Sequence, residues 1–431
     1  MSRSVRTTWV LALGVAAWLL LGFAVSGASE RFYLVLPPLA LGVFLARNDQ
    51  PRRWLMTEAP RILVFLVALV VVCAAFGLVW ARASKSPLLR MAPEVLFAVY
   101  FLSGAVLLIG AVRSALRGAG RWLGDRCFGR APVTRWARVG RLLVADVLPL
   151  LLLLNFTLAY LLAALYVHRF KMPNPVTPRE ALARSYEDVS FTTADGLAIR
   201  GWFIPAIRPS TKTVVICHGL GANRSMFLPC VLVADALDAN ALLFDFRGHG
   251  DSDGHTCSLG HAERLDVLAA VDYLRTERPE QARSLIGYGI SMGSAALLRA
   301  AAELERPFDA VIVDSGFAAA TDLTDSILVF FPAPLRPCLT GLGVPLASLH
   351  AGCWLPDCRP EDCMSRLRAP VLIAHGRGDP LIPSDHARRL YEHAREPKGL
   401  LLVDTKDHAA VLATGEEQYL HAVKAICKKG D

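Results

Sequence analysis

The chain has 431 residues, a length that suggests two structural units rather than one. Hydrophobic residues make up 54% of the chain and the mean hydropathy is +0.40, both high for a soluble protein. The net charge of +8 is unevenly divided, because residues 1–170 hold 19 Lys and Arg against six Asp and Glu, whereas the rest is net negative. Basic residues beside apolar runs are typical of loops flanking membrane spans. They argue against nucleic-acid binding, which needs a basic face on a folded domain.

Five apolar runs in residues 1–170 predict a membrane region with four or five transmembrane helices, since a spanning helix needs about 20 apolar residues. The runs are Thr8–Val25, Phe32–Ala46, Ile62–Ala81, Val95–Val112 and Leu142–Val167. The second run is short and contains two prolines, so it could instead be re-entrant. The first run is interpreted as a retained anchor rather than a cleaved signal peptide, because four more runs follow it. Only Asp146 is acidic within a run, which favours anchoring over transport.

The orientation of this region is predicted by arginines between the fourth and fifth runs. There are eight: Arg113, Arg117, Arg121, Arg126, Arg130, Arg135, Arg138 and Arg141. A short basic segment stays on the cytoplasmic side. One further crossing by Leu142–Val167 would therefore place the rest of the chain on the exoplasmic side, in the periplasm or outside the cell. Pro149 could instead bend this run into a re-entrant hairpin, which would return the rest to the cytoplasm.

The pattern changes after a linker at residues 171–185, where three prolines prevent a continuous helix. In residues 186–431, Asp195-Gly196 predicts a hairpin between strands Val189–Thr193 and Ala198–Ile204. Further strands are predicted at Thr213–Cys217, Ala241–Phe244, Leu285–Ile290, Ala310–Val313, Val371–Ala374 and Leu400–Val403, with helices between most of them, such as Ala262–Arg275 and Ser294–Leu304. Fully apolar strands that alternate with helices predict an α/β fold with a mostly parallel sheet covered on both faces.

The sequence Gly289-Ile290-Ser291-Met292-Gly293 has the form G-x-S-x-G. It follows a predicted strand and precedes an alanine-rich helix, which is the setting of a nucleophile elbow. Glycines two residues on either side of Ser291 remove the Cβ atoms that would clash where strand and helix close together. This context predicts that Ser291 is a catalytic nucleophile.

Two further residues follow later strands in the order that a Ser–acid–His triad requires in this fold. Asp379 comes after Val371–Ala374, and His408 comes after Leu400–Val403. We therefore predict that His408 is the general base and Asp379 the acid that orients it. Asp314 and Asp407 are the alternatives for the acid.

The loop after the strand Thr213–Cys217 supplies one oxyanion-hole N–H in such folds. By position the donors are predicted to be the backbone N–H groups of Leu220 and Met292. His218 comes too early in the chain to be the base, so we interpret it as a residue that positions this loop. The polar loop Asp245–Ser252 is interpreted as architectural.

Two other segments leave alternatives open. Residues Ala318–Asp362 lie between two predicted strands and are either a packed helical connection or a short cap that admits an acyl chain. Cys353, Cys358 and Cys363 are either unrelated thiols or the site of a disulfide, which would require an oxidising compartment. No cysteine pair has zinc-site spacing, so neither a metal nor another cofactor is predicted.

Taken together, the motifs in residues 186–425 resemble those of the serine aminopeptidase-like and lysophospholipase-like α/β-hydrolases. They are His218–Asn223, Asp245–Ser252, Gly289–Gly293, Asp314–Phe317 and His375–Asp379. The resemblance implies an esterase, acylglycerol lipase or thioesterase. The leading hypothesis is thus a membrane-anchored serine hydrolase that cleaves a small-molecule or lipid ester. A peptidase or acyltransferase with the same triad, and a catalytically idle membrane interaction protein, are the alternatives.

Overall fold

The structure is a computed structural model of the whole chain, and it describes residues 110–428 apart from 111, 114, 130–133, 169–170 and 330. The first three apolar runs, and nearly all of the fourth, lie outside the described residues. The chain divides into two compact units at Leu161–Leu162.

In the first unit, the arginine-rich segment that was expected to be a loop is largely helical. Residues 115–128 are helical, and α6 (Arg135–Leu142) continues through a π-helical turn (Leu143–Val147) into α7 (Leu148–Val167). The π-helical turn precedes Pro149, and such turns accommodate a residue that cannot donate its backbone hydrogen bond. The helix therefore does not turn back at Pro149. Within the described part of the chain, Arg135–Val167 is the one unbent helix that is long and apolar enough to cross a membrane.

The second unit contains an eight-stranded mixed sheet, which confirms the predicted α/β-hydrolase type of fold. Its strands are β1 (Glu187–Thr192), β2 (Ala198–Ile204), β3 (Lys212–Cys217), β4 (Asn240–Phe244), β5 (Ser284–Ile290), β6 (Ala310–Asp314), β7 (Val371–Gly376) and β8 (Lys398–Val403). The spatial order is β1-β2-β4-β3-β5-β6-β7-β8. β2 pairs antiparallel with both β1 and β4, and the strands from β4 to β8 in this spatial order are parallel to one another.

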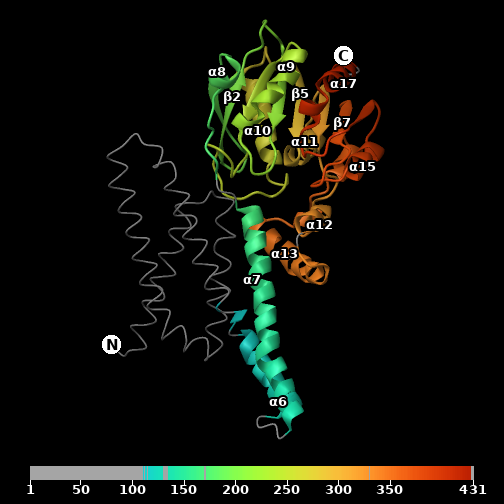
Figure 1. Cartoon of the computed structure of the whole chain (residues 1–431). Coiled ribbons are helices and arrows are strands. Elements are labelled where there is room, and N and C mark those ends of the chain that lie inside the picture. The colour runs from blue at the N-terminus through green and yellow to red at the C-terminus, as the bar shows by residue number, and fades with distance from the viewer. Residues whose placement is uncertain are drawn as a thin grey trace, which may run out of the picture. The chain divides into compact units, whose positions relative to one another are not determined.

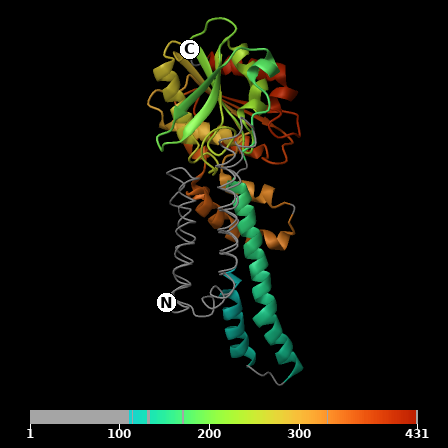
Figure 2. The same ribbon diagram turned by 90° about the vertical axis from the view of Figure 1, so that its left-hand side faces the viewer.

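Helices cover both faces of this sheet, so its central strands are buried on both sides (Figures 1 and 2). One face packs against α10 (Arg264–Glu277), α11 (Met292–Glu303) and α15 (Asp385–His393), and the other packs against α9 (Val231–Ala236), α16 (Val411–Thr414) and α17 (Glu416–Cys427). Burial on both faces explains why these strands are continuous apolar runs.

The connection between β6 and β7 is helical, and both alternatives for it, a packed helical connection and a short cap, stay open. It contains α12 (Leu323–Ile327), α13 (Arg336–Ala351) and α14 (Glu361–Met364). Cys353, Cys358 and Cys363 are free thiols here, and the Sγ of Cys358 donates instead to the carbonyl of Leu259 at 2.8 Å. The alternative of a disulfide in this cluster is therefore not realised in the structure.

The proline-containing linker belongs to the second unit and packs against the part that contains the sheet. Its α8 (Pro178–Leu182) is capped by Thr177 and Glu180, whose side chains bond each other's backbone N–H groups. The side chain of Asn174 donates to Asp245 and to Asp251, at 3.0 Å in each case. The end of α7 is also attached, since the backbone N–H of Cys257 donates to the carbonyl of Val167 at 2.8 Å. The second unit, Leu162–Asp431, is called the catalytic unit below, after the site described next.

Candidate active site

Ser291 lies on a tight turn between β5 and α11, as the sequence predicted. Its backbone angles are φ 53° and ψ −120°, a conformation that costs free energy in a non-glycine residue. The turn is held by hydrogen bonds to the end of β6, because the backbone N–H of Ser291 donates to the carbonyl of Asp314 at 2.9 Å. The side chain of Ser294 donates to the carbonyl of Gly289 at 2.7 Å. The surrounding structure thus fixes the strained turn that presents the serine.

The two glycines of the G-x-S-x-G sequence occupy positions where a Cβ atom has no room. A Cβ on Gly289 would lie 2.7 Å from the carbonyl oxygen of Gly293, and a Cβ on Gly293 would lie 2.1 Å from the carbonyl oxygen of Cys217. Both distances are well below van der Waals contact with backbone atoms that cannot move aside.

We therefore expect Gly293→Ala to destabilise the protein by about 3 kcal/mol or more, since overpacking against fixed backbone is costly. Thermal unfolding of the full chain in detergent measures this. Gly341→Ala in α13 is the matched control, because a Cβ there meets nothing within 4 Å. An equal melting temperature for the two variants would contradict the prediction.

The structure brings Ser291, His408 and Asp379 into one hydrogen-bonded chain. The Oγ of Ser291 lies 2.9 Å from Nε2 of His408, and Nδ1 of His408 lies 2.7 Å from Oδ2 of Asp379. Because an ionised carboxylate only accepts, Nδ1 carries the proton and Nε2 is free to accept one from the serine. This is the geometry that a nucleophile, a base and an orienting acid require.

Asp379 is held as a carboxylate by several donors. Burial raises the pKa of Asp379, but the hydrogen bond from His408 and those from the backbone N–H groups of Ile382 and Leu381 lower it below the usual value overall. The other atom of the carboxylate, Oδ1, accepts both backbone bonds, at 2.9 and 3.0 Å. Asp379 therefore has a fixed orientation and stays ionised at neutral pH.

The alternative acids contact other groups. The carboxylate of Asp314 accepts from the hydroxyls of Tyr288 at 3.3 Å and Ser315 at 2.9 Å, and burial raises its pKa to about 6. The backbone N–H of Asp407 donates to Thr405. Nδ1 of His408 donates its hydrogen bond to Asp379 rather than to either alternative.

Two buried histidines hold the loop that follows β3. Nε2 of His218 accepts the backbone N–H of Phe246 at 3.0 Å, so its Nδ1 must donate to the carbonyl of Gly219, 2.7 Å away. Nε2 of His249 accepts the N–H of Gly221 at 3.2 Å. Burial, with a contribution from the nearby His249, lowers the pKa of His218 to about 3. His218 is thus neutral, has both ring nitrogens engaged in backbone contacts, and positions the loop.

The loop after β3 passes directly beside the nucleophile. A Cβ built on Gly219 would lie 3.4 Å from the Cβ of Ser291. Leu220 follows in this loop, and Met292 is the first residue of α11. The oxyanion-hole role of their N–H groups stays a prediction. His249 is the residue that sequence reasoning missed, and its place in the glycine-rich Asp245–Ser252 loop was the available signal.

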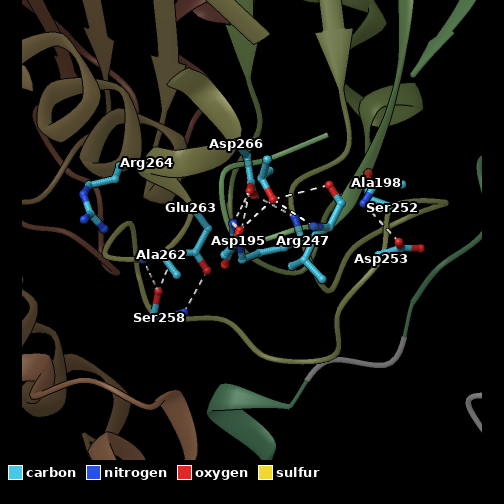
Figure 3. A network of polar contacts seen from close by, with 12 residues as sticks. Asp195, Ala198, Arg247, Ser252, Asp253, Ser258, Ala262, Glu263, Arg264 and Asp266 are labelled. Carbon is cyan, nitrogen blue, oxygen red and sulfur yellow. Dashed lines mark hydrogen bonds and ion pairs between the residues drawn. The ribbon is translucent and has the colours of Figure 1, made fainter. Parts of the chain in front are cut away.

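The Asp245–Ser252 loop is fixed by one buried and one partly buried ion pair of Arg247 (Figure 3). Arg247 donates to Asp195 in the β1–β2 hairpin at 2.6 Å and to Asp266 in α10 at 2.7 Å. Nearby, the carboxylate of Glu263 accepts the backbone N–H and the hydroxyl of Ser258. Removing one partner of a buried pair leaves an uncompensated charge, so these contacts strongly favour one loop conformation.

Comparison with known proteins gives the family. Residues 208–345 match the family model described as "Serine aminopeptidase, S33". The chain is 30% identical to YfhR of Salmonella typhimurium over 257 residues, which cover 58% of this chain and 83% of that protein. It is 31% identical to YqkD of Bacillus subtilis over 239 residues, 54% of this chain and 76% of YqkD.

A solved structure with a similar fold is the esterase Pf2001 of Pyrococcus furiosus. Its TM-score is 0.52 at 25% sequence identity, and the match covers 61% of this chain and 98% of the esterase. The match therefore spans nearly the whole of a known esterase. The chain has an eight-stranded sheet, a strained serine at the elbow and relatives matched over most of their length. It is therefore a hydrolase of the α/β-hydrolase superfamily and belongs to the family that the serine aminopeptidase S33 model describes.

Proposed function

We propose that this protein is a membrane-anchored serine esterase that cleaves carboxylic esters through an acyl-enzyme. The observation that carries this proposal is the chain of hydrogen bonds from Ser291 through His408 to Asp379. Such an arrangement lets His408 take the serine proton as Oγ attacks a carbonyl carbon, while Asp379 stabilises the imidazolium that forms.

The reaction then proceeds in two halves. The N–H groups of Leu220 and Met292 would stabilise the oxyanion, each contributing about 2.7–4 kcal/mol to the transition state. His408 passes its proton to the leaving alcohol, and a water molecule activated by the same histidine hydrolyses the acyl-serine. No step requires a metal or another cofactor.

The substrate class is tested with a panel offered to the full chain in detergent. The panel contains acyl esters of increasing chain length, aminoacyl amides, and an acceptor alcohol that would report acyl transfer. We expect turnover of the esters. Faster hydrolysis of aminoacyl amides would favour the peptidase alternative, and product esters with the acceptor would favour the acyltransferase. No turnover and no labelling by a fluorophosphonate would favour an idle interaction protein.

We also propose that the catalytic unit lies on the exoplasmic side of the membrane. The arginines of the helical segment before α7 favour a cytoplasmic location for that segment, and α7 is uncharged throughout its length. One crossing by α7 would then carry the catalytic unit across. Because α7 continues as a helix through Pro149, a crossing is favoured over a re-entrant turn.

The proposed location predicts access by an external protease. Because the linker is packed, a recognition site should be inserted in the exposed loop Ile207–Pro209 instead. Added to intact cells, or to spheroplasts if an outer membrane is present, an impermeant protease is expected to cut this site. Cleavage only after lysis would place the catalytic unit in the cytoplasm.

A further inference from the structure

The middle of the connection between β6 and β7, which we call the cap segment (residues 326–356), is unusually poor in charge. Residues 326–356 contain a single Lys, Arg, Asp or Glu, namely Arg336, although such residues make up 19% of the chain. The guanidinium of Arg336 donates to the backbone carbonyls of Phe331 at 2.9 Å and Val329 at 2.8 Å. Apart from this one arginine, the segment carries no charged side chain.

The exposed side of α13 is a continuous apolar stripe. It runs at helical spacing of three and four residues, and we call these five residues the apolar stripe: Leu335, Cys338, Leu342, Pro345 and Leu349. Leu342 is 39% exposed and Leu349 is 41% exposed, whereas Leu339 and Ala347 on the other side are buried. A helix in a water-soluble domain normally shows its polar face to solvent.

The exposed apolar surface extends beyond the helix. Trp354, after the end of α13, is 51% exposed, and Val329, before it, is 52% exposed. Soluble monomers rarely expose apolar patches that continue over several turns, so a patch of this kind marks an interaction surface. Trp is also the residue type that is enriched where a protein meets the membrane–water interface.

The structure indicates what covers this surface. The C-terminal end of α13 contacts the C-terminal end of α7, where Nε2 of His168 lies 3.1 Å from Nδ1 of His350. α7 has twenty residues without a charge, and its last carbonyl, that of Val167, is bonded to the catalytic unit through Cys257. The apolar stripe thus ends, at Leu349, beside the point where the proposed membrane anchor joins the catalytic unit.

We infer that α13 lies in the surface of the bilayer that α7 crosses, with the apolar stripe among the upper acyl chains. An interfacial helix of this kind is stabilised in proportion to the apolar area it buries in lipid. The connection that contains α13 follows directly after Asp314, whose carbonyl holds the nucleophile turn. If α13 lies in the bilayer surface, the substrate is a long-chain ester taken directly from the membrane. This consequence rests on the proposed esterase function.

The contact is tested on the full chain in phosphatidylcholine vesicles that contain a lipid with a photoactivatable diazirine in its acyl chain. After irradiation, mass spectrometry identifies the labelled peptides. We expect label on residues 333–355 and on α7. The charged helix α15 (Asp385–His393) is the internal control and should remain unlabelled. Absence of label from residues 333–355, or cross-linking of this segment to a second copy of the chain instead of to lipid, would overturn the inference.

The consequence for the substrate is tested with Leu342→Glu/Leu349→Glu, which places charge in the apolar stripe without altering the buried side of α13. We expect kcat/KM for a long-chain ester in vesicles to fall at least about tenfold, since two apolar side chains lose their burial in lipid. Hydrolysis of a short water-soluble ester should stay within about twofold. Ile207→Glu is the matched control, because Ile207 is also exposed but lies far from the cap segment in sequence.

These measurements separate the two proposals. If the native chain hydrolyses no ester but residues 333–355 still take up the lipid label, the membrane surface stands and the esterase function fails. If both esters are hydrolysed equally well by the double variant and by the native chain, the esterase function stands and delivery of the substrate through α13 is overturned.

Discussion

Ser291→Ala is expected to abolish both fluorophosphonate labelling and ester hydrolysis, lowering kcat by a factor on the order of 10⁶, as loss of the nucleophile does in other serine hydrolases. The alanine removes the only atom that the geometry presents to both His408 and the substrate, and it leaves the backbone of the elbow unchanged. Labelling and hydrolysis are measured on the full chain in detergent.

Ser294→Ala is the matched control for this experiment. Ser294 lies one turn away in α11, and its hydroxyl bonds the carbonyls of Gly289 and Asp314 rather than the histidine. Its loss is expected to lower stability by about 1 kcal/mol, the usual net value of a hydrogen bond, and to preserve labelling. Full labelling of Ser291→Ala, or loss of labelling only in Ser294→Ala, would refute Ser291 as the nucleophile.

Asp379→Asn is expected to lower kcat by about 10⁴, the loss seen for the equivalent change in the serine-protease triad. An asparagine Oδ1 can still accept from the N–H groups of Leu381 and Ile382. Its NH₂ group would then face Nδ1 of His408, which would have to become an acceptor. In that tautomer Nε2 carries the proton and cannot take another from Ser291.

Asp314→Asn is the comparison variant, and a loss of less than about tenfold is expected for it, since its carboxylate bonds hydroxyls rather than the imidazole. Steady-state kinetics on one soluble ester, with unfolding curves to show that each variant is folded, gives the ratio. A larger loss for Asp314→Asn than for Asp379→Asn would reassign the acid.

The strands of the catalytic unit could be predicted because burial on both faces leaves a direct sequence signal. Predicted and observed strands differ by at most two residues at an end; Ala310–Val313 was expected, for example, and Ala310–Asp314 is observed. The three residues that meet at the elbow could also be predicted, since each follows the carboxyl end of a parallel strand and those ends share one edge of the sheet.

The supporting contacts could not be predicted, because they depend on how distant segments pack. Asn174 lies 71 residues before its partner Asp245, and no local pattern marks either one. The arginine-rich segment before α7 was expected to be a loop because it is basic and lies between apolar runs. It is helical because arginine and leucine, which are frequent in it, have good helix propensity. Its helices also pack closely: Gly140 has no Cβ, which leaves room for the ring of Phe128.

The attachment of the linker has a consequence for how the catalytic unit can be isolated. A fragment that starts at Tyr186, where the hydrolase pattern begins in the sequence, would lack Asn174 and its bonds to Asp245 and Asp251. It would also leave the side chain of Asn223, beside the nucleophile loop, without the carbonyl of Pro173 that it bonds. Val167 would be missing from the hydrophobic core it shares with the sheet. The unit that folds thus includes the last turn of α7, so expression fragments need to begin within that helix and to keep its apolar end in detergent.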